Sequence, residues 1–184
     1  MMKIVVGITG ASGAAYGIAV LKHLKSCGIE SHLVMSPWAH RTIVLETDLD
    51  PARVVKLASC NYPAEDMAAP LASGSFSHNG MIIAPCSMKT LAAIACGYSG
   101  NLIARAADVT IKEGRRLVLL TRETPLSPIH LENMLKLARC GVVIMPPVPA
   151  LYHGPATVEE VVNQTAGRAL ALLGIQNDLY PRWK

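Results

Sequence analysis

Hydroxyl side chains follow several apolar runs of the sequence, at positions that favour binding of an anion. Thr9 and Ser12 follow the first run within "GITGASGAAYG", Ser36 follows the second, and "SMKT" at residues 87–90 follows the third. At the start of a helix the backbone N–H groups are unpaired and the helix dipole is positive, so a phosphate is stabilised there. The serines together favour a cofactor phosphate with its ribityl chain, whereas N-capping alone would explain Ser12 or Ser87.

Four cationic side chains form a second candidate set, suited to a monophosphate. Arg105 and Lys112 are separated by two turns of a helical pattern and so share a face, while Arg122 and Arg168 belong to other elements. A charge-assisted contact to a partly buried phosphate contributes about 1.5–3 kcal/mol, against about 0–1 kcal/mol for an exposed ion pair. Three such contacts would hold a monophosphate; the alternative for each residue is a solvated surface charge.

Glu123 directly follows Arg122 at the end of a predicted strand, where it is either a general acid or base or that arginine's partner. The six histidines form neither H-x-H nor H-E-x-x-H, so no metal site is expected. The G-x-S-x-G nucleophile motif is absent. A Tyr-x-x-x-Lys pair at residues 180–184 contains Pro181, which excludes the helix that a short-chain dehydrogenase needs. Hydrolase, metalloenzyme and dehydrogenase chemistry are therefore disfavoured.

The elements that must position these residues follow a βαβ pattern, with helical patterns between apolar runs. The runs that predict buried strands are residues 3–8, 31–36, 80–85, 115–122 and 141–146. Because these runs are continuous rather than alternating, helices should cover both faces of a parallel sheet. We therefore predict a three-layer α/β fold in one domain, residues 1–184, with ligands outside the carboxyl ends of the strands.

Between the predicted strands, local signals mark helix starts and one long connection. Asp50-Pro51 and Ser127-Pro128 each predict an N-cap followed by proline at the first helical position. The weakly patterned stretch from residue 61 to 79 predicts a mobile loop near the carboxyl edge of the sheet, either a lid or a plain connection.

Composition indicates an ordinary globular protein. Of the 184 residues 51% are hydrophobic, and a net charge of +4 spread along the chain argues against nucleic-acid binding. The five cysteines show neither C-x-x-C nor framework spacing, as expected for reduced thiols. No apolar run approaches the roughly 18 residues that span a bilayer. We therefore expect a cytoplasmic protein that binds neither nucleic acid nor membrane.

Longer segments of the chain resemble one family. They are "GITGASGAAYG", "LETD" at residues 45–48, "APCSMKTLAAIACG" and "NLIARAADVTIKEGRRLVLLTRETPL". Together with Tyr152 and Arg168 they resemble the UbiX/Pad1 flavin prenyltransferases over nearly the whole chain. The resemblance implies a Rossmann-like flavoprotein that joins a dimethylallyl group, from dimethylallyl monophosphate, to N5 and C6 of reduced FMN. It also implies a homododecamer whose product, prenyl-FMN, serves UbiD-type decarboxylases.

The same resemblance implies a role for each candidate residue. Glu123 would transfer protons during ring closure, with Ser12 and Lys112 also in the catalytic set and Glu46 nearby. The residues implied to bind FMN are Gly10, Ala11, Ser12, Ser36, Ser87, Met88, Lys89, Thr90 and Arg122. Those expected around the dimethylallyl phosphate are Lys112, Arg122, Tyr152, Arg168, Arg105 and Trp183. Trp183 would stabilise the cation-like allyl group, unless it only anchors the tail.

Two alternatives remain open from the sequence. Flavin-dependent cysteine decarboxylases resemble one another in an Asn-Thr after the third strand and a P-x-M-N segment near the fifth, where this chain has "PCSMKTLA" and "MPPVPALYHG". A non-catalytic FMN-binding accessory subunit of a phenolic-acid decarboxylase would need no second phosphate clamp. The decarboxylase served, a mono- or diphosphate donor, and the site that the C-terminal tail covers are also left open.

Overall fold

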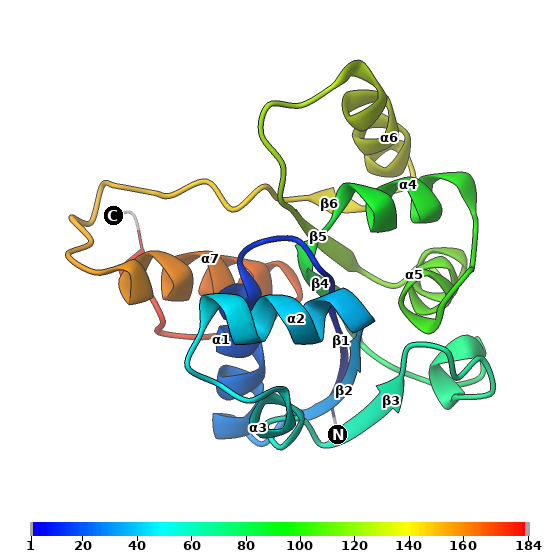
Figure 1. Cartoon of the computed structure of the whole chain (residues 1–184), viewed down its shortest axis with the longest axis horizontal. Helices are drawn as coiled ribbons and strands as arrows, with labels where there is room; N and C mark the ends of the chain where they lie inside the picture. The colour runs from blue at the N-terminus through cyan, green and yellow to red at the C-terminus, as the bar shows by residue number, and fades with distance from the viewer. Residues whose placement is uncertain (1, 183–184) are drawn as a thin grey trace.

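A sheet of six parallel strands forms the middle layer of the computed structural model, which describes residues 2–182 (Figure 1). The strands are β1 Lys3–Ile8, β2 Glu30–Met35, β3 Cys60–Pro63, β4 Gly80–Cys86, β5 Leu117–Thr121 and β6 Val143–Ile144. Their spatial order is β3-β2-β1-β4-β5-β6, and each neighbouring pair is parallel. The order reverses direction between β1 and β4, which is the switch point where ligands bind in Rossmann-like sheets.

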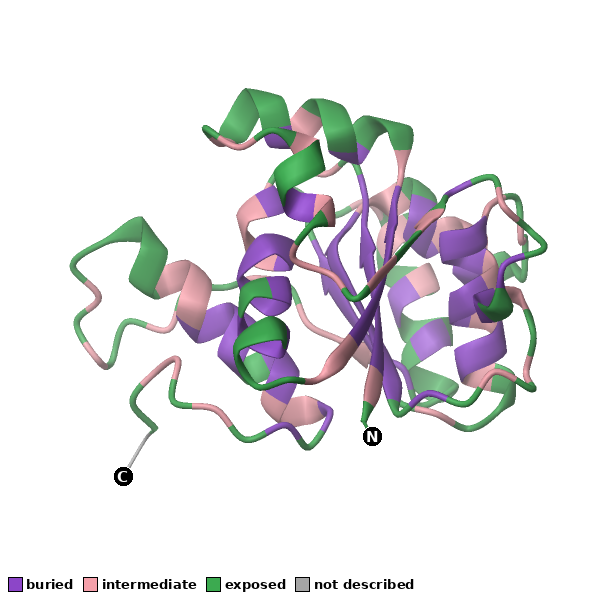
Figure 2. Cartoon of the chain, turned by 90° about the horizontal axis from the view of Figure 1, so that it is seen from below, coloured by how far each residue is buried: buried purple, intermediate pink, exposed green. Residues whose placement is uncertain are grey.

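Helices cover both faces of this sheet, so the predicted three-layer α/β fold is confirmed (Figure 2). The helices are α1 Ala14–Ser26, α2 Pro37–Glu46, α3 Pro51–Val55, α4 Met88–Cys96, α5 Leu102–Lys112, α6 Pro128–Arg139 and α7 Val158–Leu172, with a 3₁₀ helix η1 at Pro70–Ala72. α1, α2, α3 and α7 pack on one face, and α4, α5 and α6 pack on the other. No helix within residues 2–182 is long and apolar enough to cross a membrane.

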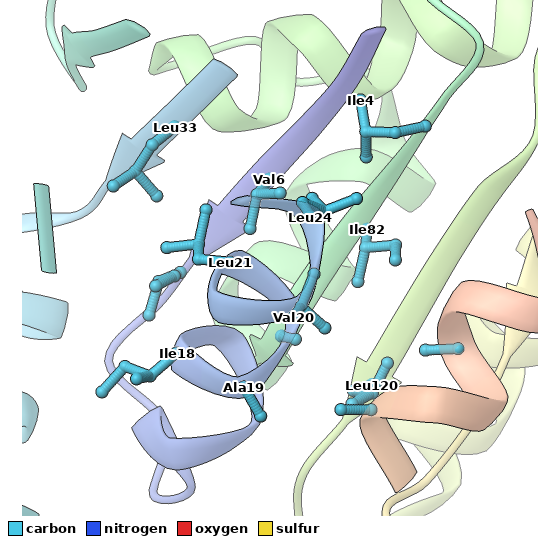
Figure 3. Packing of buried hydrophobic residues seen from close by; sticks show 14 of the residues in the cluster. Ile4, Val6, Ile18, Ala19, Val20, Leu21, Leu24, Leu33, Ile82 and Leu120 are labelled. Atoms are coloured by element: carbon cyan, nitrogen blue, oxygen red, sulfur yellow. The ribbon is translucent and has the colours of Figure 1, made fainter. Parts of the chain in front are cut away.

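The first face of the sheet packs tightly against α1 (Figure 3). Ile4 and Val6 of β1 alternate toward this face and meet Leu21 of the helix, and all three side chains are fully buried. Burial of each such side chain contributes about 1.5–3 kcal/mol. Gly17 permits the close crossing of α1 over β4, because a Cβ there would lie 2.3 Å from the Ala84 carbonyl oxygen. The crossing fixes the start of α1 beside the switch point.

Both predicted helix starts are confirmed. The Asp50 carboxylate accepts the Ala52 N–H at 2.7 Å at the start of α3. At the start of α6, Ser127 and His130 form a capping box in which each side chain accepts the other's backbone N–H. Proline follows each cap, where its missing N–H costs nothing.

The connection around residues 60–79 differs from the prediction. Residues 60–63 form β3, an edge strand paired only with β2, whose alternating burial and Pro63 conceal it in the sequence. The following segment is anchored by two arginines. Arg115 donates to the carbonyls of Phe76 and Gly74 at 2.8 and 2.9 Å, and Arg105 donates to that of Ala72 at 3.0 Å. These contacts favour a plain connection over a lid.

His78 at the end of this connection should make the fold sensitive to acid. Burial, and then the nearby Arg115 charge, lower its pKa from the usual 6.5 to about 4. Between these values the unfolded chain binds the proton and the folded chain does not, so stability falls as the pH drops from about 6.5 to about 4. We expect His78→Gln to reduce this acid-induced loss in the free energy of unfolding by about 2 kcal/mol. This is less than the full pKa shift corresponds to, since residual solvent contact weakens the effect.

Urea unfolding of the wild type and His78→Gln at a series of pH values measures this difference. The exposed His40→Gln variant is the matched control and should keep the wild-type slope. The slope that persists in His78→Gln should come largely from His32, whose pKa is also lowered by burial. Parallel curves for the wild type and His78→Gln would contradict the prediction.

Candidate active site

A buried threonine joins the carboxyl ends of β1 and β4 at the switch point. The Thr9 hydroxyl donates to the Pro85 carbonyl at 2.7 Å and accepts the Ser87 N–H at 2.9 Å. Thr9 is 1% exposed, so both bonds lie out of water and hold the two strand ends in register. Cys86 lies beside them, but burial raises the pKa of its thiol to about 12, which leaves it protonated and without a nucleophilic role.

The N-terminus of α4 presents open donors at this edge of the sheet. Ser87 caps the helix: its Oγ accepts the Thr90 N–H at 3.3 Å and donates to the Thr90 hydroxyl at 3.2 Å. Within residues 2–182 no partner is found for the amides of Met88 and Lys89. Ser36 caps α2 at the end of β2, on the other side of β1, where its Oγ accepts the Ala39 N–H at 3.2 Å. The two capping hydroxyls and the open amides of α4 fit the phosphate of a mononucleotide.

The loop Gly10–Ser12 lies against the start of α2. A Cβ at Gly10 would lie 2.3 Å from the Cβ of Trp38, so only glycine allows this approach. The N-cap of α1 is Gly13, with φ 104°, and it has no side chain of its own to cap the helix. N-capping therefore does not explain Ser12, which is exposed and whose hydroxyl has no partner within the described part of the chain. Ala11, between Gly10 and Ser12, is half-buried, so the loop has only small side chains and a flat ring can approach it closely.

Glu46 occupies the anion position at the start of α1. Its Oε2 accepts the N–H groups of Gly13 and Ala14 at 2.8 and 3.1 Å. The carboxylate thus satisfies the first amides of this helix and complements its dipole. A ligand phosphate is consequently directed to the starts of α4 and α2 and away from the glycine loop.

Arg122 and Glu123 are exposed at the end of β5. Glu123 accepts the Thr124 N–H at 3.0 Å, and no ion pair among residues 2–182 joins it to Arg122, so its carboxylate is not simply that arginine's partner. Burial raises the pKa of Tyr16 and the positive charge of Arg122 opposes this, which places the two near each other. Thr121 Oγ1, at the end of the same strand, is buried and has no hydrogen-bond partner in the described residues.

Tyr152 and Arg168 line a separate cavity of about 530 Å³ between α7 and the C-terminal tail. The Tyr152 hydroxyl donates to the Pro181 carbonyl at 3.1 Å, and Arg182 adds a second guanidinium to the lining. The structure therefore brings Tyr152 and Arg168 together, as predicted, but the strand-end residues do not line this cavity. Trp183 lies outside the described residues, so its predicted role stays a prediction.

Arg105 and Lys112 share a face of α5, as their spacing predicts, on the other side of the sheet. Arg105 pairs with Asp108 at 2.7 Å, and Lys112 pairs with Glu113. α5 and α7 cover opposite faces of the sheet. One chain therefore does not bring Lys112 and Arg168 to the same phosphate.

Three residues of these sites were missed in the sequence: Thr9 as a link between strands, Tyr16 beside Arg122, and Arg182 in the tail cavity. Thr9 had a signal, since a hydroxyl directly after a strand often bonds a neighbouring strand end. Tyr16 and Arg182 had none, because their place depends on how α1 and the tail pack.

The Thr9 link can be tested by removing its hydroxyl. We expect Thr9→Val to lower the free energy of unfolding by about 2 kcal/mol, because a buried carbonyl and a buried N–H lose their partner. The start of α4 should also shift, so affinity for FMN, the cofactor that the sequence resemblance implies, should fall about tenfold, whereas Thr9→Ser should retain both properties. Urea unfolding and flavin fluorescence titration measure the two effects. Equal FMN affinity in all three proteins would rule out a positioning role.

Comparison with known proteins places this arrangement in a family. The model of the family described as Flavoprotein matches residues 1–170. The chain is 54% identical to the flavin prenyltransferase PAD1 of Saccharomyces cerevisiae, over 99% of this chain and 75% of the yeast protein.

Two solved structures superpose closely on the chain. AnUbiX in complex with FMN and dimethylallyl pyrophosphate is 52% identical, with a TM-score of 0.98 over 100% of this chain and 97% of that one. A dodecameric FMN-dependent UbiX-like decarboxylase from Escherichia coli O157:H7 is 50% identical, with a TM-score of 0.98 over 100% of both chains. The chain therefore belongs to the flavoprotein family and, within it, to the UbiX/Pad1 flavin prenyltransferases.

Proposed function

We propose that this protein joins the dimethylallyl group of dimethylallyl monophosphate to N5 and C6 of reduced FMN. The observation that carries the proposal is the pairing, at the switch point, of open phosphate donors on α4 with Arg122 and Glu123 after β5. The AnUbiX relative binds FMN and a dimethylallyl donor on the same fold, which supports this substrate pair.

FMN would be held by the strand-end residues. The phosphate would lie at the starts of α4 and α2, bound by Ser87, the amides of residues 88–89 and Ser36, and Gly10–Ser12 and Arg122 would face the isoalloxazine ring. When bound, reduced FMN supplies the nucleophilic atoms that accept the prenyl group. The buried Thr121 hydroxyl, which has no partner within residues 2–182, would hydrogen-bond a polar atom of the bound ligand.

The cationic residues would stabilise the departing phosphate. Cleavage of the allylic C–O bond leaves its electron pair on the phosphate, and positive side chains fixed in advance stabilise that charge more in the transition state than in the ground state. Lys112, Arg122, Arg168 and the Tyr152 hydroxyl would share this role, with Arg105 nearby. Glu123 would move the proton released when the second ring bond forms.

We further propose that each site is built from more than one copy of the chain. Lys112 and Arg168 lie on opposite faces of the sheet, so both reach one phosphate only if they come from different copies. A homododecamer would provide such contacts, as the dodecameric Escherichia coli relative suggests. Apolar side chains of this chain remain exposed on α2 and α6, including Leu45 at 72% and Ile129 at 68%, and suit burial between copies.

The wider setting follows from the same proposal. Prenyl-FMN would pass to a UbiD-type decarboxylase, and residues 1–184 would act as one flavoprotein domain. The five cysteines carry free thiols, which suits the reducing cytoplasm.

Release of inorganic phosphate tests this function against an accessory role. The protein is incubated anaerobically with reduced FMN and dimethylallyl monophosphate, with a chelator present, and in parallel with the diphosphate. A prenyltransferase should release phosphate from the monophosphate, or pyrophosphate from the diphosphate, only when reduced FMN is present, and ³¹P NMR, which distinguishes the two leaving groups, should show faster release from the preferred donor. An accessory subunit should bind FMN and release none, which would overturn the proposal.

A further inference from the structure

Three side chains that can ligate a metal converge on β2 and β3, where the sheet has its edge. Glu30 and His32 are two residues apart on β2 and so point to the same face. Cys60 of β3 lies directly opposite His32 in the strand register. A Glu30 carboxylate oxygen, a ring nitrogen of His32 and the Cys60 sulfur all lie within 4.8 Å of one another.

We propose that Glu30, His32 and Cys60 form a zinc site distinct from the flavin site. Carboxylate, imidazole and thiolate are the protein ligands of zinc, at bond lengths of about 2.0–2.3 Å, and a tetrahedral ion holds them roughly 3.5 Å apart. The pair Glu30 Oε1 and His32 Nε2 is at 2.9 Å, so small side-chain rotations suffice. A carboxylate and a thiolate balance the two charges of the ion, and a water completes the coordination.

A tyrosine orients the histidine among the three ligands. His32 is 2% exposed, and its Nδ1 lies 3.0 Å from the Tyr62 hydroxyl while its Nε2 faces Glu30. A proton on Nδ1 donated to Tyr62 leaves the Nε2 lone pair directed at the metal position, the arrangement typical of metal-binding histidines. The Phe76 ring packs edge-on at 4.9 Å and holds the imidazole plane.

The strands that carry the ligands are fixed to each other beside the cluster. The N–H of Ser31 donates to the Ser59 hydroxyl at 3.1 Å, and the N–H of Ser59 donates to the Ser31 hydroxyl at 3.2 Å. Ser31 lies between two ligands on β2, and Ser59 directly precedes Cys60. These reciprocal bonds set the register of β2 and β3, so little conformational entropy is lost when a metal binds.

The position is also open to solvent on one side. The Glu30 side chain is 25% exposed and Cys60 is half-buried, which provides a path for the ion. Lys3 is the competing cation, with its Nζ 3.5 Å from the Glu30 carboxylate. Zinc would displace this ammonium group, so removing the lysine charge should strengthen metal binding.

Occupancy would tie the edge strand β3 to β2 and stabilise the folded state by mass action. The site is not predictable from the sequence, because its ligands form an E-x-H pattern on one strand with the thiol on the next, and no H-x-H pattern. The proposed zinc site is separate from the flavin site. Of the strands β2 and β3 that carry its ligands, only β2 contributes to the flavin site, through Ser36 at its carboxyl end.

Cobalt substitution tests the proposal on the full chain, reduced and freed of metal by a chelator. Co²⁺ should give the thiolate charge-transfer absorption of a sulfur ligand and visible bands of tetrahedral intensity, and Zn²⁺ should abolish both by competition. Cys60→Ser should lose the charge-transfer band, Tyr62→Phe should bind about tenfold more weakly, and Lys3→Met should bind more tightly. Thermal unfolding should show a zinc-dependent rise in Tm in the wild type and none in Cys60→Ser.

Cys27→Ser is the matched control, because Cys27 lies 3.4 Å from His23 Nε2 and is the rival thiol and imidazole pair. Circular dichroism establishes that each variant is folded. The proposal is overturned if Co²⁺ gives no thiolate band with the wild type, or if Cys27→Ser abolishes the band and Cys60→Ser keeps it. Because none of these measurements uses flavin turnover, they are independent of the proposed prenyltransferase activity.

Discussion

Co-expression of Lys112→Met and Arg168→Met chains is expected to restore about a quarter of wild-type prenyl-FMN formation, although each variant alone should lose about 10- to 100-fold. Each substitution removes a charge-assisted contact to the prenyl phosphate. Because α5 and α7 cover opposite faces of the sheet, the two residues of one site should come from two copies. In randomly mixed oligomers, about one site in four then has both residues intact.

The matched control is co-expression of wild type with the double variant Lys112→Met/Arg168→Met. Sites built from two copies predict about one quarter of full activity in this mixture as well, whereas sites within one chain predict about one half. Sites within one chain also predict no recovery from the two single variants. Activity is measured as the rate of prenyl-FMN formation per chain, at equal expression of both chains.

Glu123→Gln is expected to keep FMN affinity within about twofold while slowing formation of the closed adduct by about 10²-fold or more. The amide preserves shape and can still accept the Thr124 N–H through its oxygen, but it cannot take up a proton at neutral pH. The absence of an ion pair to Arg122 among residues 2–182 means that the loss of charge should not disturb that arginine.

Single-turnover kinetics with reduced FMN measures this effect. The exposed Glu132→Gln on α6 serves as control and should match the wild type in both affinity and rate. Wild-type adduct formation by Glu123→Gln would remove this carboxylate from the mechanism.

The strongly apolar strands and the capped helices were predictable from the sequence. Residues 4–8 and 80–86 are buried on both faces, so their apolar runs are continuous. Ser127-Pro128 marks its helix start through local interactions alone. β3 was not predictable, because a short edge strand with one partner needs no apolar run. Its existence depends on pairing with β2, which is tertiary information.

The candidate residues at the strand ends were equally predictable from the sequence, since the carboxyl ends of parallel strands lie at one edge of the sheet. Ser36 and Ser87 lie at the ends of β2 and β4, the two strands that flank β1, and both cap helices there. The phosphate clamp was not resolved by sequence, because spacing shows that Lys112 shares a face with Arg105 but not which side of the sheet that face covers. The cluster of Glu30, His32 and Cys60 was also not predictable from the sequence, because Cys60 lies beside His32 only through the register of β2 and β3.

The mass of the flavin extracted after anaerobic incubation with reduced FMN and dimethylallyl monophosphate tests the central claim most directly. A flavin prenyltransferase predicts a species heavier than FMN by one five-carbon prenyl unit, formed in proportion to phosphate release. Recovery of unmodified FMN alone, under conditions in which an authentic flavin prenyltransferase forms the adduct, would contradict the account.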